Sequence, residues 1–157
     1  MNTRYATSKD IPELVRVINL AYRVEDFFID GDRTNVADVE DRIEAPGSCF
    51  IVVDSDNADK IAGAVFVDIH GTRGHFAVLS VDPAFQGRGV ARLLIEAVEK
   101  HCRGAGCDTI DIEVVNLRLE LPAFYTRFGF TPIGTAIFPA TEKLTRDASL
   151  ILMSKAL

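Results

Sequence analysis

The order of hydrophobic and polar residues first predicts an amphipathic helix near the N-terminus. Leu14, Ile18 and Ala21 recur at helical spacing, so one face of this segment packs inward while the other stays polar. The period then breaks at a loop that contains Gly31, after which Thr34 is placed to cap another short helix. The elements predicted here are a short strand over residues 4–7, a helix from 11 to 22 or 23, and a helix over residues 36–44.

From residue 49 onward, short runs of β-branched and aromatic residues replace the helical period, as expected of strands. The first two runs flank a polar turn at residues 56–60, which favours a hairpin. The third run leads into a strand, crossover helix and strand unit. The predicted strands are 49–54, 61–69, 75–81, 109–115, 130–138 and 148–155, and the predicted helices are 87–103 and 121–128.

These elements predict a fold of the α/β class (α+β type), with a mixed, mostly antiparallel sheet of roughly six or seven strands and about four flanking helices. The length of 157 residues suits one domain over residues 1–157. The chain contains no internal repeat or low-complexity tract that would divide it.

Composition and charge narrow the class of protein. No apolar run approaches the roughly 20 residues that cross a bilayer, and residues 1–14 lack the apolar core of a signal peptide, so we expect a cytoplasmic protein without membrane partners. Cys49, Cys102 and Cys107 are then expected to be free thiols. The formal charge of -6 argues against a nucleic-acid partner, which needs a clustered basic surface.

The most informative segment is a turn with two glycines between the predicted strand 75–81 and the helix that follows. Glycines let the backbone approach a ligand, and the first helical amides have no partners within the helix, so this turn can bind phosphate. A dinucleotide fingerprint requires Gly or Ala where Arg92 stands, and the preceding strands look antiparallel, so we reject that class. The turn consists of Gln86, Gly87, Arg88, Gly89, Val90, Ala91 and Arg92.

With Val81 and Pro83, this turn resembles the acyl-CoA-binding motif of the GNAT family of N-acetyltransferases, whose pattern is Gln or Arg, two residues, Gly, one residue, then Gly or Ala. The run 124–130, Phe-Tyr-Thr-Arg-Phe-Gly-Phe, resembles the second signature of the family. The resemblance covers residues 51–138 and implies a sheet that is splayed between the strands ending at Val81 and near Val115. It also implies acetyl-CoA as the acyl donor.

The resemblance implies how the cofactor is bound. Backbone groups of Leu79, Ser80 and Val81 would bond the pantetheine arm in strand fashion, and the amides of residues 87–92 would bind the pyrophosphate. The side chains of Arg88 and Arg92 either add charge to this contact or are solvated.

The resemblance also implies that Tyr125 is the general acid, because a phenol with a reference pKa of about 10 stays protonated and can donate to the departing sulfur. His75 stands where several family members place an acidic residue or a water, so it is the candidate base. A lone strand histidine is also commonly structural, and Ser80 and Glu113 are alternatives. No His or Cys spacing indicates zinc, so we expect no metal.

On the acceptor side, the family layout implies the loop 27–34 and the turn near Phe138. Arg33 and Arg118 suit a substrate carboxylate, although Arg118 can equally pair with Glu120 or with solvent. Asp30 and Asp32 instead suit an amine, so the sequence leaves the acceptor open. The candidate acceptor residues are Phe27, Phe28, Arg33 and Arg118, of which the two phenylalanines can also be core residues.

The function expected from the resemblance is transfer of an acetyl group from acetyl-CoA to a primary amine by direct attack in a ternary complex. The acceptor would be a small molecule or a peptide. The alternative is a non-catalytic acyl-CoA-binding regulatory module. The protein is expected to be a monomer or a homodimer, since the final strands 130–138 and 148–155 can pair within or between chains.

Overall fold

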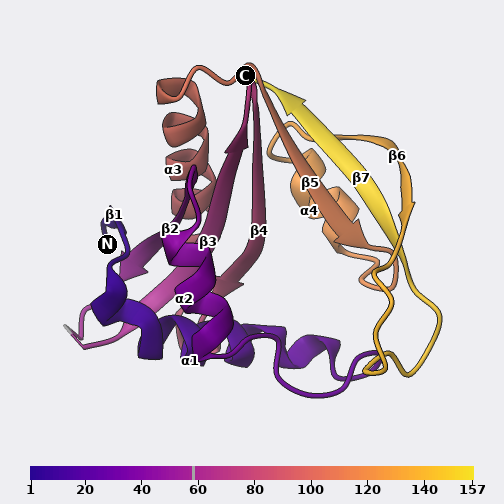
Figure 1. The fold of residues 1–157 in the computed structure, drawn as a ribbon, viewed down its shortest axis with the longest axis horizontal. Helices are drawn as coiled ribbons and strands as arrows, with labels where there is room; N and C mark the ends of the chain where they lie inside the picture. The colour runs from indigo at the N-terminus through magenta and orange to yellow at the C-terminus, as the bar shows by residue number, and fades with distance from the viewer. Residues whose placement is uncertain (58) are drawn as a thin grey trace.

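The computed structural model describes residues 1–57 and 59–157, which form one sheet in the order β1-β2-β3-β4-β5-β7-β6 (Figure 1). The strands are β1 (Thr3–Tyr5), β2 (Ser48–Asp54), β3 (Ile61–His70), β4 (Arg73–Val81), β5 (Thr109–Val115), β6 (Thr131–Ile137) and β7 (Ser149–Ala156). The α-helices are α1 (Ile11–Ala21), α2 (Val36–Glu44), α3 (Val90–Gly104) and α4 (Leu121–Thr126), and the 3-10 helices are η1 (Ser8–Asp10), η2 (Tyr22–Glu25) and η3 (Pro83–Phe85).

The expected fold class is confirmed. The strand pairs are antiparallel except for the β4 and β5 pair, which is parallel and is joined through α3. The predicted turn at residues 56–60 includes residue 58, which lies outside the described residues. None of the helices in the described part of the chain combines the length and the apolar character needed to cross a membrane.

One predicted helix cap and one predicted helix start differ from the structure. Asn35, and not Thr34, caps α2, because the Asn35 side chain accepts a hydrogen bond from the Asp38 amide at 2.9 Å. The Thr34 hydroxyl instead donates to the Asp38 carboxylate at 2.5 Å. Helix α3 begins at Val90 and not at residue 87, since Gly87 and Gly89 both adopt positive φ, which is incompatible with a right-handed helix.

The two faces of the sheet bury separate hydrophobic cores. Helix α3 packs on one face with Leu94, Ile95 and Val98, while α1 and α2 cover β2, β3 and β4 on the other face. Each helix is amphipathic, so the apolar stripe predicted from its sequence is the side that faces the sheet. In the left half of Figure 1 these helices cover β2, β3 and β4, and β5, β6 and β7 diverge from that half toward the right.

The divergence begins where β4 and β5 stop pairing. Their ladder joins residues 73–75 to residues 109–111, and the strands separate from there toward the bottom of Figure 1. A bulge in β4 contributes, because Val78 has φ 49° and the β3 register shifts between Ala64 and Phe66. Positive φ is unusual for a β-branched residue, so the surrounding packing must hold it. The result is a wedge-shaped opening with an unpaired β4 edge.

The start of α3 lies very close to β3 at Gly63. A Cβ atom at this position would lie 2.7 Å from Val90 Cγ1 and 2.8 Å from the Ser80 carbonyl oxygen. Because the carbonyl belongs to the neighbouring strand, it has little room to move. A glycine here therefore lets the first turn of α3 rest on the sheet.

We expect Gly63→Ala to lower the free energy of unfolding by about 1–3 kcal/mol, as other overpacked sites do. Urea unfolding measures this change. Gly104→Ala is the matched control, since nothing lies within 4 Å of its Cβ position, and it should be neutral or slightly stabilising. Equal stability of the two variants would contradict the close approach of α3.

Candidate active site

The wedge between β4 and β5 holds a cleft of about 830 Å³. It is lined by the bulged end of β4, the glycine turn, β5, α4, η2, the loop after η2 and the loop before β7. Its lining includes Tyr22, Glu25, Arg33, Leu79, Val81, Gln86, Gly87, Gly89, Val90, Ala91, Glu113, Arg118, Tyr125 and Phe138. The structure thus brings most of the predicted cofactor residues and Tyr125 to a single cleft.

The glycine turn presents unpaired amides to open space. In the described part of the chain, Leu93 is the first amide after the turn to donate a backbone bond into the helix, to the Gly89 carbonyl at 3.1 Å. The amides of residues 87–92 donate none of the bonds found there. Gly87 and Gly89 have φ of 76° and 77°, and nothing lies within 4 Å of either Cβ position. Unpaired amides at the N-terminus of a 15-residue helix suit an anionic phosphate.

Arg88 and Arg92 are held away from the cleft. Their guanidinium carbons lie 5.3 Å from the ring centre of Phe85 and 5.2 Å from that of Phe128, respectively. Neither arginine lines the cleft, so in this structure the turn presents its backbone, and not these two side chains, to the cleft. A phosphate contact by either side chain stays a prediction.

The end of β4 offers backbone to the cleft. Leu79 and Val81 line it, whereas the Ser80 side chain is buried on the opposite side and donates to the Val78 carbonyl at 2.8 Å. The bulge at Val78 produces this alternation, because it moves Leu79 and Val81 onto the face that carries α3. Ser80 can therefore contribute its backbone but not its hydroxyl.

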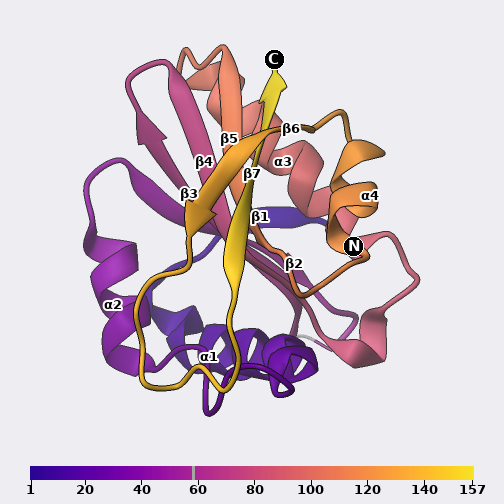
Figure 2. The same ribbon diagram turned by 90° about the vertical axis from the view of Figure 1, so that its right-hand side faces the viewer.

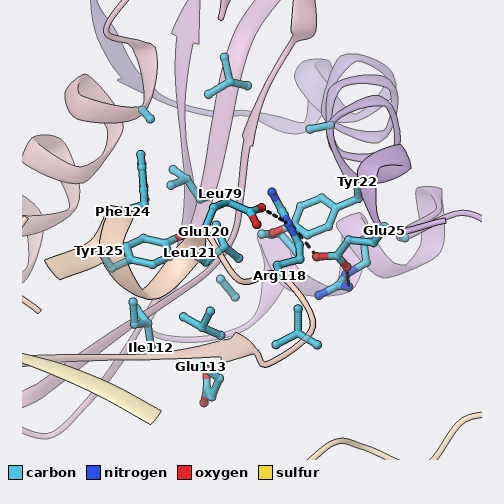
Figure 3. A pocket seen from close by; sticks show the side chains of 18 of the residues that line it. Tyr22, Glu25, Leu79, Ile112, Glu113, Arg118, Glu120, Leu121, Phe124 and Tyr125 are labelled. Atoms are coloured by element: carbon cyan, nitrogen blue, oxygen red, sulfur yellow. Dashed lines mark hydrogen bonds and ion pairs between the residues drawn. The ribbon is translucent and has the colours of Figure 1, made fainter. Parts of the chain in front are cut away.

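Tyr125 is held by aromatic neighbours. It extends from α4, is 9% exposed, and its ring centre lies 6.0 Å from those of Phe76 and Phe130. Burial raises its pKa above the usual value of 10.0, so the phenol stays protonated at neutral pH. In Figure 3 its hydroxyl end points into the pocket. The arrangement suits a hydrogen-bond or proton donor.

Both ring nitrogens of His75 contact carboxylates, whereas a general base needs a free ring nitrogen that faces the substrate. Its Nδ1 lies 2.7 Å from the Asp68 carboxylate and its Nε2 lies 2.6 Å from that of Glu113, so it links β3, β4 and β5. It does not line the cleft. The hydrogen bond with Asp68, and to a smaller extent the one with Glu113, raises the pKa of His75 to about 10, which keeps the ring protonated at neutral pH. A protonated imidazole cannot accept a proton, so this geometry favours a structural role at the closed end of the wedge.

The predicted acceptor residues fall into two groups. Arg33 and Arg118 line the cleft, but Phe27 and Phe28 do not. Phe28 is fully buried and packs edge-on against Phe138 at 6.5 Å, while Phe27 is 44% exposed beneath Arg146. The phenylalanines therefore anchor the loop and do not form the pocket wall.

Two loops that are distant in sequence meet at the open end of the wedge. The Asp30 amide donates to the Lys143 carbonyl at 2.8 Å, and the Thr145 amide donates to the Phe28 carbonyl at 2.9 Å. Figures 1 and 2 both show the segment after η2 beside the loop between β6 and β7. The contact joins the two sides of the wedge at its open end.

Glu25 is a functional candidate that the sequence reasoning missed. It lines the cleft but is only 3% exposed, and it accepts hydrogen bonds from Arg33 at 3.1 Å and Arg118 at 3.4 Å. Burial raises its pKa, and the two arginines oppose that effect. One signal was present in the sequence. Glu25 continues the apolar face of Leu14 and Ile18, where an acidic residue is out of place unless it has buried partners.

The described residues include no group of three or more His, Cys, Asp or Glu side chains that is arranged to hold a metal ion.

A sequence model of the acetyltransferase (GNAT) family matches residues 15–130. The chain therefore belongs to the GNAT family, and the resemblance carried by the glycine turn and by the run 124–130 is confirmed.

Known proteins agree with this assignment. Mycothiol acetyltransferase from Gordonia bronchialis is 30% identical over 131 residues, which make up 80% of this chain and 42% of that protein. The chain spans less than half the length of the curated mycothiol acetyltransferases that it matches. The ribosomal-protein-alanine N-acetyltransferase of Brucella melitensis has a TM-score of 0.78 over 100% of both chains, at 19% identity. A Salmonella typhimurium protein solved with its cofactor acetyl-CoA has a TM-score of 0.76 over 99% of this chain and 93% of that one, at 17% identity.

The bridging position of His75 predicts a pH-dependent stability. Its pKa is raised from 6.5 to about 10, so the stabilisation is complete below about pH 6.5 and is lost as the pH rises toward 10. We expect the free energy of unfolding of the wild type, relative to His75→Gln, to fall across this window in urea titrations at constant ionic strength.

His70→Gln is the control for this prediction. The His70 ring is 71% exposed and contacts Asp68 alone among the partners of the network, so its loss should change stability little at any pH. Titration of the His75 ring by NMR is a direct test, and an ordinary pKa near 6.5 would contradict the bridge.

Proposed function

We propose that residues 1–157 form a single acyltransferase domain that transfers the acetyl group of acetyl-CoA to a primary amine, by direct attack in a ternary complex. The observation that carries this proposal is the cleft itself. It places the unpaired amides of the glycine turn, the unpaired edge of β4 and the Tyr125 phenol along one continuous opening. Membership of the GNAT family supports the same activity.

The residues on the β4 side fit acetyl-CoA. The amides of residues 87–92 would bind the pyrophosphate, and the backbone of Leu79 and Val81 would pair with the pantetheine arm as an added strand. Space above Gly87 and Gly89 is open, as a bound phosphate requires. When bound, acetyl-CoA supplies an activated acetyl thioester.

Tyr125 would act at the reacting end of the cleft. Its raised pKa keeps the phenol protonated at neutral pH, so the hydroxyl would be available to donate to the departing sulfur as negative charge develops on it. The aromatic packing around the ring fixes where the hydroxyl points and excludes water from one side of it. The amine would approach from the opposite wall, formed by η2 and the loop after it.

The names of similar proteins support either a small molecule or a peptide as the amine acceptor. One solved neighbour is named for ribosomal-protein alanine and the curated relatives for mycothiol, so both a peptide and a small-molecule acceptor occur among similar proteins. A thiol-release assay over amino acids, polyamines, aminoglycosides and peptide N-termini tests the proposal. Cofactor binding without thiol release from any amine would favour the non-catalytic acyl-CoA module instead.

Acetyl-CoA binding to the glycine turn predicts a ligand-linked stabilisation. At 100 times its dissociation constant, acetyl-CoA should raise the free energy of unfolding by about 2.7 kcal/mol in a thermal shift assay. Gly89→Asp should abolish this gain, because Asp tolerates positive φ but places a negative charge at the phosphate site.

Gly106→Asp is the matched control for the charge. Gly106 also has positive φ, nothing lies within 4 Å of its Cβ position, and it lies beyond the far end of α3. This variant should keep the full response to acetyl-CoA, and a loss equal to that of Gly89→Asp would argue against the turn as the binding site.

The proposed proton donor predicts a defect in kcat. Tyr125→Phe keeps the ring and its packing but removes the hydroxyl, so kcat should fall by about 100-fold, the lower end of the range for general acids, while acetyl-CoA affinity is retained. Tyr5→Phe, which changes an exposed tyrosine on β1, should keep wild-type kcat. Full turnover by Tyr125→Phe at saturating acetyl-CoA would remove the donor role.

A further inference from the structure

The acceptor wall of the cleft contains two arginines that meet at one buried carboxylate. Arg33 and Arg118 come from segments far apart in the chain, and both donate to Glu25, to its Oε1 and Oε2 atoms respectively. Two guanidinium groups repel each other, so the buried carboxylate between them is what allows them to sit side by side. The geometry of the pair is therefore fixed before any ligand arrives.

Most of the donors of this pair are unused. A guanidinium carries five N–H donors in a rigid fork. Among the hydrogen bonds of the described residues, Arg33 donates one and Arg118 donates two, to Glu25 and Glu120. Both side chains line the cleft, so several donors remain for a ligand on that side.

The local charge also favours an anion. Glu25 is almost completely buried and neutralises one of the two arginines. The Glu120 side chain is 62% exposed, so water screens much of its attraction for Arg118. Asp30 and Asp32, the two acids of the loop after η2, also line the cleft, and Asp32 is paired with Arg23 at 2.8 Å. The cleft wall therefore keeps a positive character around Arg33 and Arg118.

The arginine pair is close to the reacting end. In Figure 3 the Arg118 side chain lies between Tyr125 on one side and Glu25 with Tyr22 on the other. The charge of Arg118 also lowers the pKa of Tyr125 against the larger effect of burial, as expected of a neighbour. A group bound to Arg118 is thus held near the position where a thiol would depart.

Building on the proposed function, we propose that the acceptor is a primary amine that also carries a carboxylate, such as an α-amino acid, and that Arg33 and Arg118 bind this carboxylate. The spare N–H groups of the two guanidinium forks would donate to the two carboxylate oxygens, and the amine would then face Tyr125 across the cleft. Charge-assisted bonds of this kind are strong enough to set specificity.

The test compares matched acids and amides by isothermal titration calorimetry, with and without coenzyme A. L-Leucine and L-leucinamide, L-methionine and L-methioninamide, and β-alanine and β-alaninamide form the pairs, and in each pair an uncharged amide of similar size replaces the carboxylate. At about pH 6.5 the amines of all six are protonated, because α-amino groups titrate near 7.7–8.0 or above. We expect the acid of at least one pair to bind at least about tenfold more tightly than its amide.

Variants assign the preference to the two arginines. Arg33→Gln and Arg118→Gln should each remove the difference between acid and amide, and Arg118→Lys should retain part of it, since it keeps the charge and loses the fork. Arg103→Gln is the control, because Arg103 is exposed on α3 and does not line the cleft, and it should bind like the wild type. A thermal melt identifies any variant that has not folded, and the wild-type comparison needs no variant.

Equal binding of acid and amide, or no binding of any acid in the millimolar range, would overturn this inference, as would a preference that persists in both glutamine variants. Its failure is distinguishable from that of the proposed function. Thiol release from amines without any preference for a carboxylate would overturn the inference alone. A preference for the acids in binding, without thiol release from any amine, would overturn the proposed function alone.

Discussion

The early end of the ladder between β4 and β5 is the constraint on which this site depends. Pairing covers residues 73–75 and 109–111 and then stops, so a row of backbone groups on β4 is left without a strand partner. Unpaired backbone groups are costly when they are buried, and a wedge open to solvent and to a ligand avoids that cost. The bulge at Val78 aims the end of β4 into the wedge, and Gly63 lets α3 begin directly beside it.

The two ends of the wedge are held by different interactions. Charged groups join the strands at the closed end, where His75 lies between Asp68 and Glu113. At the open end, backbone hydrogen bonds and the Phe28 side chain join the loop after η2 to the loop before β7. Both attachments leave the middle of the wedge free, and the cleft lies there.

Helices, strands and turns could be predicted from the sequence because neighbouring residues determine them. The role of a side chain could not be predicted where it depends on partners that are distant in the sequence. The glycine turn could be found because positive φ and a helix start are properties of neighbouring residues. The place of His75 could not, because its two carboxylate partners lie on β3 and β5. Glu25 was overlooked for the same reason, since Arg118 is distant in the sequence. Phe27 and Phe28 were candidates for the acceptor site, but they do not line the cleft. The sequence does not separate these cases, because an apolar residue in a loop can either line a pocket or fill a core.

The sequence by itself determined the order of helices and strands, the family, the glycine turn before α3 and the aromatic run around Tyr125, because each is encoded by neighbouring residues with a fixed period or spacing. The tertiary structure decided which charges meet. It turned His75 into a protonated bridge, moved the Ser80 hydroxyl away from the cleft and assembled Arg33, Glu25 and Arg118 into one wall. Electrostatic roles depend on distance and burial, and the fold brings such groups together across tens of residues of chain.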